Sequence, residues 1–503
     1  MGTVTLDEVT HYINGQKVKG ENDKFGYVYN PSTGQRIATV PYASIKEVDE
    51  TVQLAKKAAE KWGATSVSTR IQILFKFREL LVEHTEELAK LIGKENGKTI
   101  SDAKGEIGRG IESVDLAIGA PHLIKGEHSV NVGGDINAYS MKQPLGVVTC
   151  ISPFNFPVMI PLAMSVMAVA VGNAMILKPS EKVPYSALFL SKLWEEAGLP
   201  DGVWNVVNGN KDTVNAIVMH KDVKAVSFVG STKVAEVIYE TATRHHKRVA
   251  AFGGGKNHMV IMPDADIDKV VDSFVGAAYG SAGQRCMAIS VAMPVGKKTT
   301  ELFTKKLRTK VKALKAGSYD DKDADFGALI SNDAKQEILR AIDEAVNEGA
   351  NIVVDGRNPK VENKEGFYLD ATLLDHVTPD MNIYKEEVFG PVRVIVPVET
   401  LEKAIELIND HQLGNGATIF TNNGRSARAF TQEIEVGMTG VNVPIPIPVG
   451  YHNFGGWKDS RFGDGQMFGP DTARFFTKMK TVSERWFDWE DTTNETNFDF
   501  PSS

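Results

Sequence analysis

The stretch GVVTCIS (146–152) is a short run of branched and small apolar residues that ends in a serine. Similar runs recur at AMILKPS (174–180), VWNVV (203–207), AVSFVG (225–230) and RVAAF (248–252), separated by longer segments with helical periodicity. Buried strands that alternate with helices predict a parallel sheet with crossover helices. Because nucleotides bind at the carboxyl ends of such strands, the alternation also predicts a nucleotide site.

A second alternation follows residue 257. Helical segments at 266–280 and 299–316 precede the strand-like runs NIVVDG, VRVIVPV and GATIFT. We therefore expect an α/β fold of two parallel-sheet domains with a boundary near 253–258. The polar segment 123–143, with alternating Val, Ile and Tyr, and the tail after 474 are expected to leave the main body as an excursion.

Composition excludes several classes of protein. A chain of 503 residues exceeds what one core supports, and a net charge of −8 argues against nucleic-acid binding. Two cysteines cannot form a disulfide framework, and no spacing suits structural zinc. The N-terminus shows no signal peptide, and the apolar run Phe156–Val171 is short for a membrane span and predicts a buried helix. We expect a cytoplasmic protein.

Two local signals predict structure near the N-terminus. Asn14-Gly15 lies between strand-like flanks, which is typical of a hairpin. Ser44 and Glu47 have the spacing of a capping box before an apolar stripe that ends at Gly63.

Cys286 stands in YGSAGQRCMAIS (279–290), after small residues and next to Arg285. An accessible thiol beside a positive charge favours the thiolate, although a lone cysteine is often an inert small apolar residue. FVGST (228–232) is a strand, a turn and a helix start, which suits a pyrophosphate but equally a simple N-cap.

Six motifs taken together resolve these alternatives. They occur in one order along the chain: PFNFP (153–157), LKPSE (177–181), FVGST (228–232), GGGKN (253–257), GQRC (283–286) and EEVFGPV (386–392). This arrangement resembles the aldehyde dehydrogenase superfamily across nearly the whole chain. The resemblance implies an NAD-binding domain from 1–122 and 144–254, a catalytic domain from 255–460, and oligomerisation segments at 123–143 and 474–503, usually within a homotetramer built from dimers.

The resemblance also implies roles for single residues. Cys286 would be the nucleophile, and Asn155 together with the Cys286 backbone N–H would stabilise the oxyanion. The residues that would contact NAD are Phe154, Lys178, Glu181, Ser231, Glu387 and Phe389. An acidic residue at Glu181 favours NAD over NADP. No metal is expected.

The position of the usual water-activating glutamate, four residues before Lys256, carries Phe252. Phenylalanine accepts no proton, and general-base help is worth roughly 10²–10⁴-fold in rate. Hydrolysis of a thioester on Cys286 should therefore be slow, and a thiol acceptor such as coenzyme A should replace water. His258 is a possible substitute base, but a structural role is favoured because no partner carboxylate is evident.

KNHMVIMPDAD (256–266), GQRCMA (283–288) and GNGATIFT (414–421) are similar to the coenzyme A-acylating methylmalonate-semialdehyde dehydrogenase branch. This branch implies oxidation of methylmalonate or malonate semialdehyde to propionyl-CoA or acetyl-CoA with loss of CO2. Arg109 and Arg285 would hold the substrate carboxylate, as arginine can do with two parallel hydrogen bonds. On the residues alone, Arg109 could equally be a solvated helix arginine.

The chain departs from this branch at three positions, Ala163, Phe252 and Gln284, so the preferred semialdehyde stays open. Two other interpretations also stay open: a hydrolytic aldehyde dehydrogenase that releases a free acid, and a non-catalytic NAD-binding or structural protein. The coenzyme A site and the order of decarboxylation and acyl transfer are not indicated by the residues.

Overall fold

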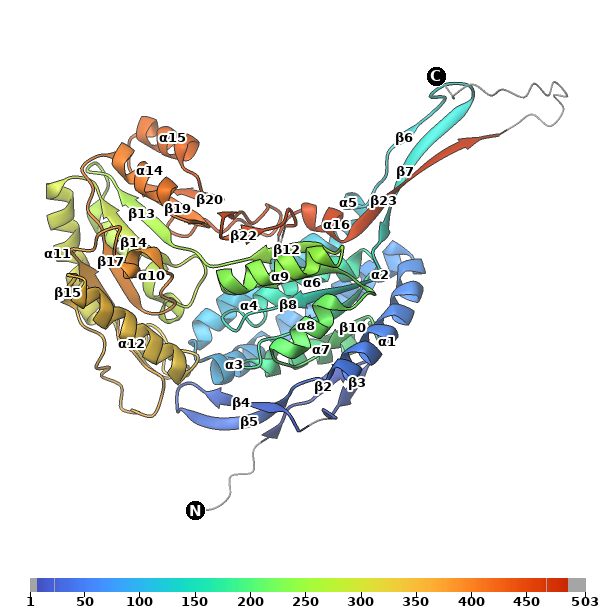
Figure 1. The fold of residues 1–503 in the computed structure, drawn as a ribbon, viewed down its shortest axis with the longest axis horizontal. Coiled ribbons are helices and arrows are strands. Elements are labelled where there is room, and N and C mark those ends of the chain that lie inside the picture. The colour runs from blue at the N-terminus through green and yellow to red at the C-terminus, as the bar shows by residue number, and fades with distance from the viewer. Residues whose placement is uncertain (1–6, 22, 467, 487–503) are drawn as a thin grey trace, which may run out of the picture.

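The computed structural model describes residues 7–21, 23–466 and 468–486, and it places two large sheets in two lobes (Figure 1). In the order of pairing, the first sheet contains β22 (Arg461–Phe462), β12 (Arg248–Phe252), β11 (Val223–Val229), β8 (Val147–Ile151), β9 (Ala174–Lys178), β10 (Trp204–Val206), β2 (His11–Ile13) and β3 (Gln16–Val18). Its five central strands, β12 to β10, are parallel, as the sequence predicted.

The second sheet contains β15 (Asn351–Val354), β16 (Thr372–Asp375), β17 (Val392–Ile395), β14 (Ile289–Pro294), β13 (Asn257–Ile261), β19 (Gly416–Phe420) and β20 (Met438–Val441). Only β15 is antiparallel to its neighbour. β12 ends at Phe252 in the first sheet and β13 begins at Asn257 in the second, so the chain changes sheet at 253–256. The full domain bounds stay a prediction.

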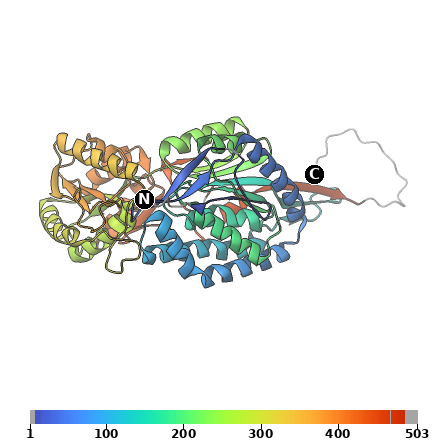
Figure 2. The same cartoon turned by 90° about the horizontal axis from the view of Figure 1, so that it is seen from below.

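Helices lie on both sides of the first sheet (Figure 2). The helices of the chain are α1 (Ile45–Ala64), α2 (Val67–Glu83), α3 (Thr85–Asn96), α4 (Ile100–Ile118), α5 (Ala120–Leu123), α6 (Met159–Ala170), α7 (Pro184–Ala197), α8 (Lys211–Met219), α9 (Thr232–Arg244), α10 (Ile267–Tyr279), α11 (Lys297–Ala313), α12 (Asn332–Asn347), α13 (Asn382–Lys385), α14 (Leu401–Asp410), α15 (Gly424–Glu433) and α16 (Asp471–Phe475). α6 to α9 are the crossovers between the parallel strands of the first sheet, and α10 and α11 match the predicted helices 266–280 and 299–316.

The local predictions are confirmed. Asn14 and Gly15 have φ of 51° and 77° between β2 and β3, as a two-residue hairpin requires. Ser44 and Glu47 form a reciprocal capping box at the start of α1.

Every residue of α6 is buried, because the predicted apolar helix packs inside the first lobe against α4. Within the described ranges, no helix combines the length and apolar character needed to cross a membrane.

Three smaller sheets complete the chain. β1 (Asp7–Glu8), β5 (Gln35–Pro41) and β4 (Phe25–Asn30) form one, and β18 (Leu413–Gly414) pairs with β21 (Trp457–Lys458). The third is an arm of β23 (Thr477–Arg485), β7 (Ile136–Pro144) and β6 (His128–Ser129), which extends from the first lobe (Figure 1). The arm thus joins the two segments expected to leave the body; the part of the tail at 487–503 lies outside the described residues.

Candidate functional site

Three of the predicted cofactor segments follow neighbouring parallel strands. Phe154 and Asn155 come after β8, Lys178 ends β9, and Ser231 comes after β11, and the sheet order places β8 between the other two strands. The carboxyl ends of parallel strands share one edge of a sheet, so these side chains gather at the edge where such folds bind nucleotides.

The residues at this edge fit a dinucleotide. Ser231 occupies the N-cap position of α9, but its side chain makes no cap hydrogen bond, so the simple N-cap interpretation does not account for the hydroxyl. The first N–H groups of α9 therefore lack a side-chain acceptor and suit a phosphate. Lys178 is buried, with its Nζ 3.4 Å from Oε2 of Glu181. Burial lowers the pKa of Lys178, while Glu181 opposes that shift.

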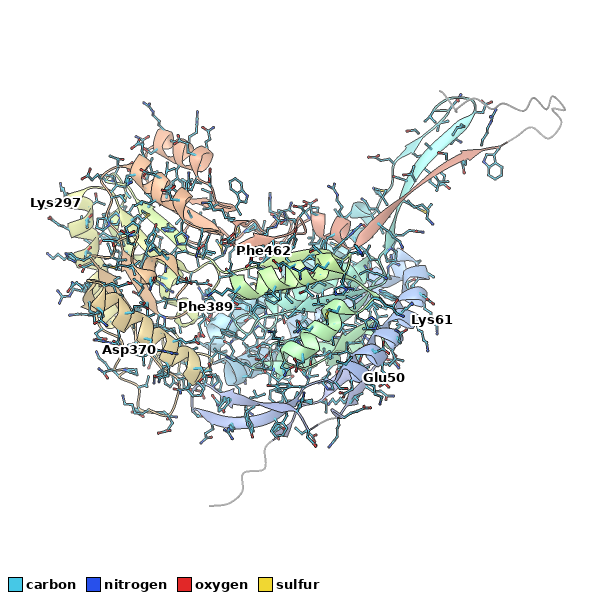
Figure 3. All side chains as sticks on the ribbon, viewed as in Figure 1. Glu50, Lys61, Lys297, Asp370, Phe389 and Phe462 are labelled. Atoms are coloured by element: carbon cyan, nitrogen blue, oxygen red, sulfur yellow. The ribbon has the colours of Figure 1, made fainter. Side chains whose placement is uncertain are left out.

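Two aromatic rings join the lobes at this edge. Phe154 and Phe389 meet edge to face with centroids 5.9 Å apart, and Phe389 lies where the two lobes approach (Figure 3). Beside it, Oε1 of Glu387 accepts the N–H of Gly255 at 3.0 Å. A Cβ at Gly254 would lie only 2.2 Å from Oε2 of Glu387, so the close approach of this carboxyl group requires glycine. Burial raises the pKa of Glu387 to about 7.

The segment that carries Cys286 begins with a strained turn. Ser281, Ala282 and Gly283 all have positive φ, of 55°, 51° and 71°. Two consecutive non-glycine residues in the left-handed region are uncommon, and such strain gathers at functional sites. The turn leads the chain from α10 through Cys286 into β14.

Arg285 lowers the pKa of Cys286, as expected, but burial of the thiol outweighs this effect. Desolvation raises the pKa of the half-buried Cys286 thiol to about 12, and the carboxylate of Glu387 is the second cause. The N–H groups of Cys286 and Met287 oppose the shift more than Arg285 does. The guanidinium of Arg285 also has an acidic partner, since its Nη2 lies 2.5 Å from Oδ1 of Asp102.

Sequence reasoning missed the two amides that hold the nucleophile segment. The carbonyl of Cys286 accepts Nδ2 of Asn257 at 2.8 Å and Nδ2 of Asn415 at 3.1 Å. Both asparagines lie in motifs that carried the resemblance, GGGKN and GNGATIFT, but nothing in those motifs says which backbone group they reach.

Asn155 lies against the same segment. Its side chain is buried, and its Nδ2 donates to the carbonyl of Gln284 at 3.1 Å, two residues before Cys286. Its own carbonyl accepts Nζ of Lys98 at 2.6 Å. The structure thus brings the predicted oxyanion donor and the predicted nucleophile together.

A buried ion pair, Lys98 with Glu106, contacts the backbone carbonyl of Asn155. Nζ of Lys98 lies 2.7 Å from Oε2 of Glu106, and both side chains are almost fully buried. Oε1 of Glu106 accepts the N–H groups of Val158 and Met159 at 2.8 and 3.2 Å, at the start of α6. Burial raises the pKa of Glu106, and Lys98 opposes the shift.

Arg109 has different neighbours. Its Nη1 lies 2.6 Å from Oε2 of Glu112, and its Nη2 donates to the carbonyl of Pro448. Oε2 of Glu112 also accepts the N–H of Gly450 at 3.1 Å. Two residues of α4 therefore hold the loop that contains Pro448 and Gly450. Asp102 and Arg109 are seven residues apart on α4, which places them on one face about 10 Å apart along the axis. α4 therefore carries both Arg109 and Asp102, the acidic partner of Arg285.

Phe252 packs among apolar side chains, with the Arg461 guanidinium carbon 5.8 Å from its ring centroid. It is 3% exposed, meets Phe454 edge to face at 5.9 Å, and belongs to the apolar cluster against which Cys286 packs. His258 lies on β13 with its Nε2 3.1 Å from the Tyr384 hydroxyl, and burial holds the pKa of His258 well below its usual value. These contacts favour the structural interpretation of His258.

The other two departures from the branch, Ala163 and Gln284, are also buried. Gln284 is 2% exposed, and its Oε1 accepts the N–H of Ile330 at 3.2 Å. Ala163 lines a small cavity beside Ser113 and Phe468. Within the described residues, no group of three His, Cys, Asp or Glu side chains could hold a metal ion.

Known proteins share this architecture over nearly the whole chain. The chain is 50% identical to malonate-semialdehyde dehydrogenase of Pseudomonas aeruginosa, over 95% of this chain and 96% of that one. A Sinorhizobium meliloti protein solved with NAD is 47% identical with a TM-score of 0.96, over 97% of this chain and 99% of that one. Methylmalonate-semialdehyde dehydrogenase of Oceanimonas doudoroffii is 49% identical with a TM-score of 0.94, over 96% of this chain and 99% of that one. The aldehyde dehydrogenase family model matches residues 18–482, and the chain belongs to that family.

Proposed function

We propose that this chain oxidises malonate semialdehyde or its methyl homologue with NAD and transfers the acyl group to coenzyme A, with loss of CO2. The observation that carries the proposal is Phe252, whose apolar surroundings leave no proton acceptor at the position of the water-activating glutamate. The names of the Pseudomonas and Oceanimonas relatives and the NAD complex of the Sinorhizobium protein support the substrate class and the cofactor.

The proposed chemistry begins at Cys286. After losing its proton, its Sγ attacks the aldehyde carbon, and the carbonyl oxygen becomes an oxyanion. The side-chain amide of Asn155 and the backbone N–H of Cys286 donate to that oxygen. The residues that would hold NAD are Phe154, Lys178, Glu181, Ser231, Glu387 and Phe389. When bound there, NAD would supply the acceptor for the hydride that leaves the former aldehyde carbon. A thioester then remains on Cys286.

Coenzyme A completes the cycle. Its thiolate attacks the thioester carbonyl, the bond to Sγ of Cys286 breaks, and acyl-CoA leaves. The carboxylate lies on the carbon next to the thioester carbonyl, so loss of CO2 leaves an enolate that the oxyanion donors can stabilise until it is protonated. The amide of Asn155 and the backbone N–H of Cys286 can stabilise this enolate whether decarboxylation occurs before or after acyl transfer.

The substrate carboxylate is assigned to Arg285 and Arg109. Arg285 is adjacent to the nucleophile, and α4 links it to Arg109 through Asp102. Each guanidinium has an acidic partner in this structure, so the substrate would share these cations with Asp102 and Glu112.

The chain is further proposed to be a cytoplasmic homotetramer. Both cysteines are free, and chemistry at Cys286 requires a reduced thiol, which suits a reducing compartment. The arm presents exposed apolar residues that include Val130 and Met479, which suit a subunit contact.

The deciding experiment measures NADH formation from each semialdehyde with NAD, with and without coenzyme A. We expect sustained turnover only with coenzyme A, yielding acetyl-CoA or propionyl-CoA and CO2, and a single burst equivalent without it. Fast turnover to a free acid without coenzyme A would establish the hydrolytic alternative. NAD binding with no turnover under any condition would establish the non-catalytic one.

A second test addresses the carboxylate. Arg285→Met should lower kcat/KM for malonate semialdehyde by about 10²-fold, since a charge-assisted contact is worth about 1.5–3 kcal/mol. Propanal, which lacks the carboxylate, should react with this variant and the unchanged enzyme at similar rates. Equal losses for both substrates would remove Arg285 from substrate binding.

A further inference from the structure

The run Lys256-Asn257-His258 contacts both halves of the candidate site. It begins as the chain passes from the first sheet to the second, and it leads into β13. The three side chains are buried; Asn257 reaches one segment of the second lobe, and Lys256 and His258 reach another.

Asn257 reaches the nucleophile segment. Its Nδ2 donates to the carbonyl of Cys286 at 2.8 Å and to that of Ala288 at 3.0 Å. Both neighbours are acceptors, which fixes the amide with its nitrogen toward them. The amide therefore spans Met287 and fixes the peptide groups on both sides of it.

Lys256 reaches the Glu387 segment. Its Nζ donates to the carbonyls of Ile383 and Glu386 at 2.6 and 2.7 Å. The second carbonyl belongs to the residue directly before Glu387. His258 adds a contact to the same segment, since its Nε2 lies 3.1 Å from the Tyr384 hydroxyl.

We propose that Lys256 and Asn257 are positioning residues, which hold the Glu387 segment and the Cys286 segment in fixed relation from two adjacent positions, the residue just before β13 and its first residue. This inference rests on the proposed function, because it assigns those segments their roles in cofactor binding and attack. The hydrogen bonds of the two side chains show that one short run reaches both segments. His258 assists Lys256 through Tyr384.

Substitution of Asn257 and substitution of Lys256 should change different measured quantities, alkylation of Cys286 and affinity for NAD. Without the Asn257 amide, the N–H groups of Cys286 and Met287 move away from the sulfur, and both of them favour the thiolate. Asn257→Ala should therefore slow alkylation of Cys286 by iodoacetamide at pH 8 by at least about fivefold and slow the NADH burst by roughly 10–100-fold. The dissociation constant of this variant for NAD should change by less than about twofold, far less than a tenfold loss of affinity.

Lys256→Met should show the reverse pattern. Its dissociation constant for NAD should rise about tenfold, the equivalent of 1.4 kcal/mol. Alkylation of Cys286 should not slow, because the loosened segment carries Glu387, whose carboxylate raises the pKa of that thiol. Alkylation and NAD binding need neither semialdehyde nor coenzyme A. If the two patterns appear but no semialdehyde is oxidised, positioning stands and the proposed function fails.

Asn205 supplies a matched control. It is another fully buried asparagine, and its Nδ2 donates to the carbonyls of Met175 and Gly202, outside the two segments. Asn205→Ala should lower the melting temperature as Asn257→Ala does, yet leave alkylation and NAD affinity unchanged. If Asn257→Ala and Lys256→Met impair alkylation and NAD binding to the same degree, or impair neither, the inference is overturned.

Discussion

Phe252 is the single side chain on which the choice between water and coenzyme A rests. Phe252→Glu places a carboxylate at the end of β12, within the apolar cluster that also contacts Cys286. We expect acid release without coenzyme A to rise by roughly 10²-fold, because a general base contributes about this much or more. The measurement is the steady-state NADH rate from malonate semialdehyde without coenzyme A.

Phe252→Gln is the control for that substitution. Glutamine has a similar size and polarity but accepts no proton at neutral pH, so acid release should stay at the level of the unchanged chain. If Gln raises hydrolysis as much as Glu does, access of water rather than basicity limits the reaction.

Glu387 adds to the effect of burial on the ionisation of Cys286. Its carboxylate disfavours a second negative charge nearby and so raises the pKa of the thiol. Glu387→Gln removes that charge, and the thiol pKa should fall, with about tenfold faster alkylation for each unit of the fall. Because the pKa of Glu387 is itself about 7, the gain should be larger at pH 8 than at pH 6. The measurement is the rate of iodoacetamide labelling against pH.

Cys150 provides the background for this measurement. It is fully buried, and burial raises the pKa of its thiol, so it should take up no label. Cys286→Ala should therefore be unlabelled at every pH where the fold is intact. An equal gain at pH 6 and pH 8 for Glu387→Gln would mean that the carboxylate acts on the thiol by packing and not by charge.

At the scale of elements, a buried carboxyl links two helices of the first lobe. Glu95, in the last turn of α3, accepts the N–H groups of Tyr185 and Ser186 at 2.8 Å, in the first turn of α7. Burial raises the pKa of Glu95 from 4.5 to about 7. The folded chain therefore binds this proton more tightly than the unfolded chain does.

The sign of the resulting pH dependence follows directly. The contribution of Glu95 to the free energy of unfolding is fully present below pH 4.5 and is lost as pH rises through about 7. By linkage, the free energy of unfolding falls by about 3 kcal/mol over this range. Glu95→Gln does not titrate, so its free energy of unfolding should lack this decrease. Urea unfolding of both chains from pH 4.5 to 8 measures the difference, and parallel curves for the two chains would contradict it.

Some helices and strands were predictable from the sequence, whereas the contacts between them were not. β8 and β9 were predictable because a buried parallel strand is apolar along its whole length, and α6 because it is apolar all round. The support for Asn155 was not predictable. Lys98 lies in the connection between α3 and α4, and Glu106 lies in α4. Charged residues at such positions are typically solvated, and these two are buried where the distant 153–157 segment packs against them.

The nucleophile shows a similar limit. The motif predicted Cys286, but its ionisation depends on burial in the assembled structure and on Glu387, which is remote in sequence. The same holds for Asn415, whose contact with the Cys286 carbonyl exists only because β19 lies beside β13. Local patterns predict elements, whereas the electrostatics of the site comes from the assembled sheets.

At the scale of the whole molecule, the arm has little core of its own. β7 and β23 pair over nine residues, yet no residue of β7 is fully buried and most of β23 is exposed. Small sheets without a buried face are marginally stable in water, and an exposed edge strand readily pairs with another chain. The arm therefore needs a surface to cover it, and a second copy of the chain supplies one in the proposed tetramer.

Charges on the arm should weaken that contact. Val130 and Met479 are 73% and 58% exposed on it, and replacing both with glutamate would place two unpaired charges in an apolar contact. We expect the unchanged chain to sediment as a tetramer and the double variant as dimers or monomers. Met219→Glu is the control, because Met219 is 48% exposed at the end of α8, outside the arm. A tetramer that survives both glutamates would place the subunit contact elsewhere, since a buried pair of like charges costs more than an arm of this size can offset.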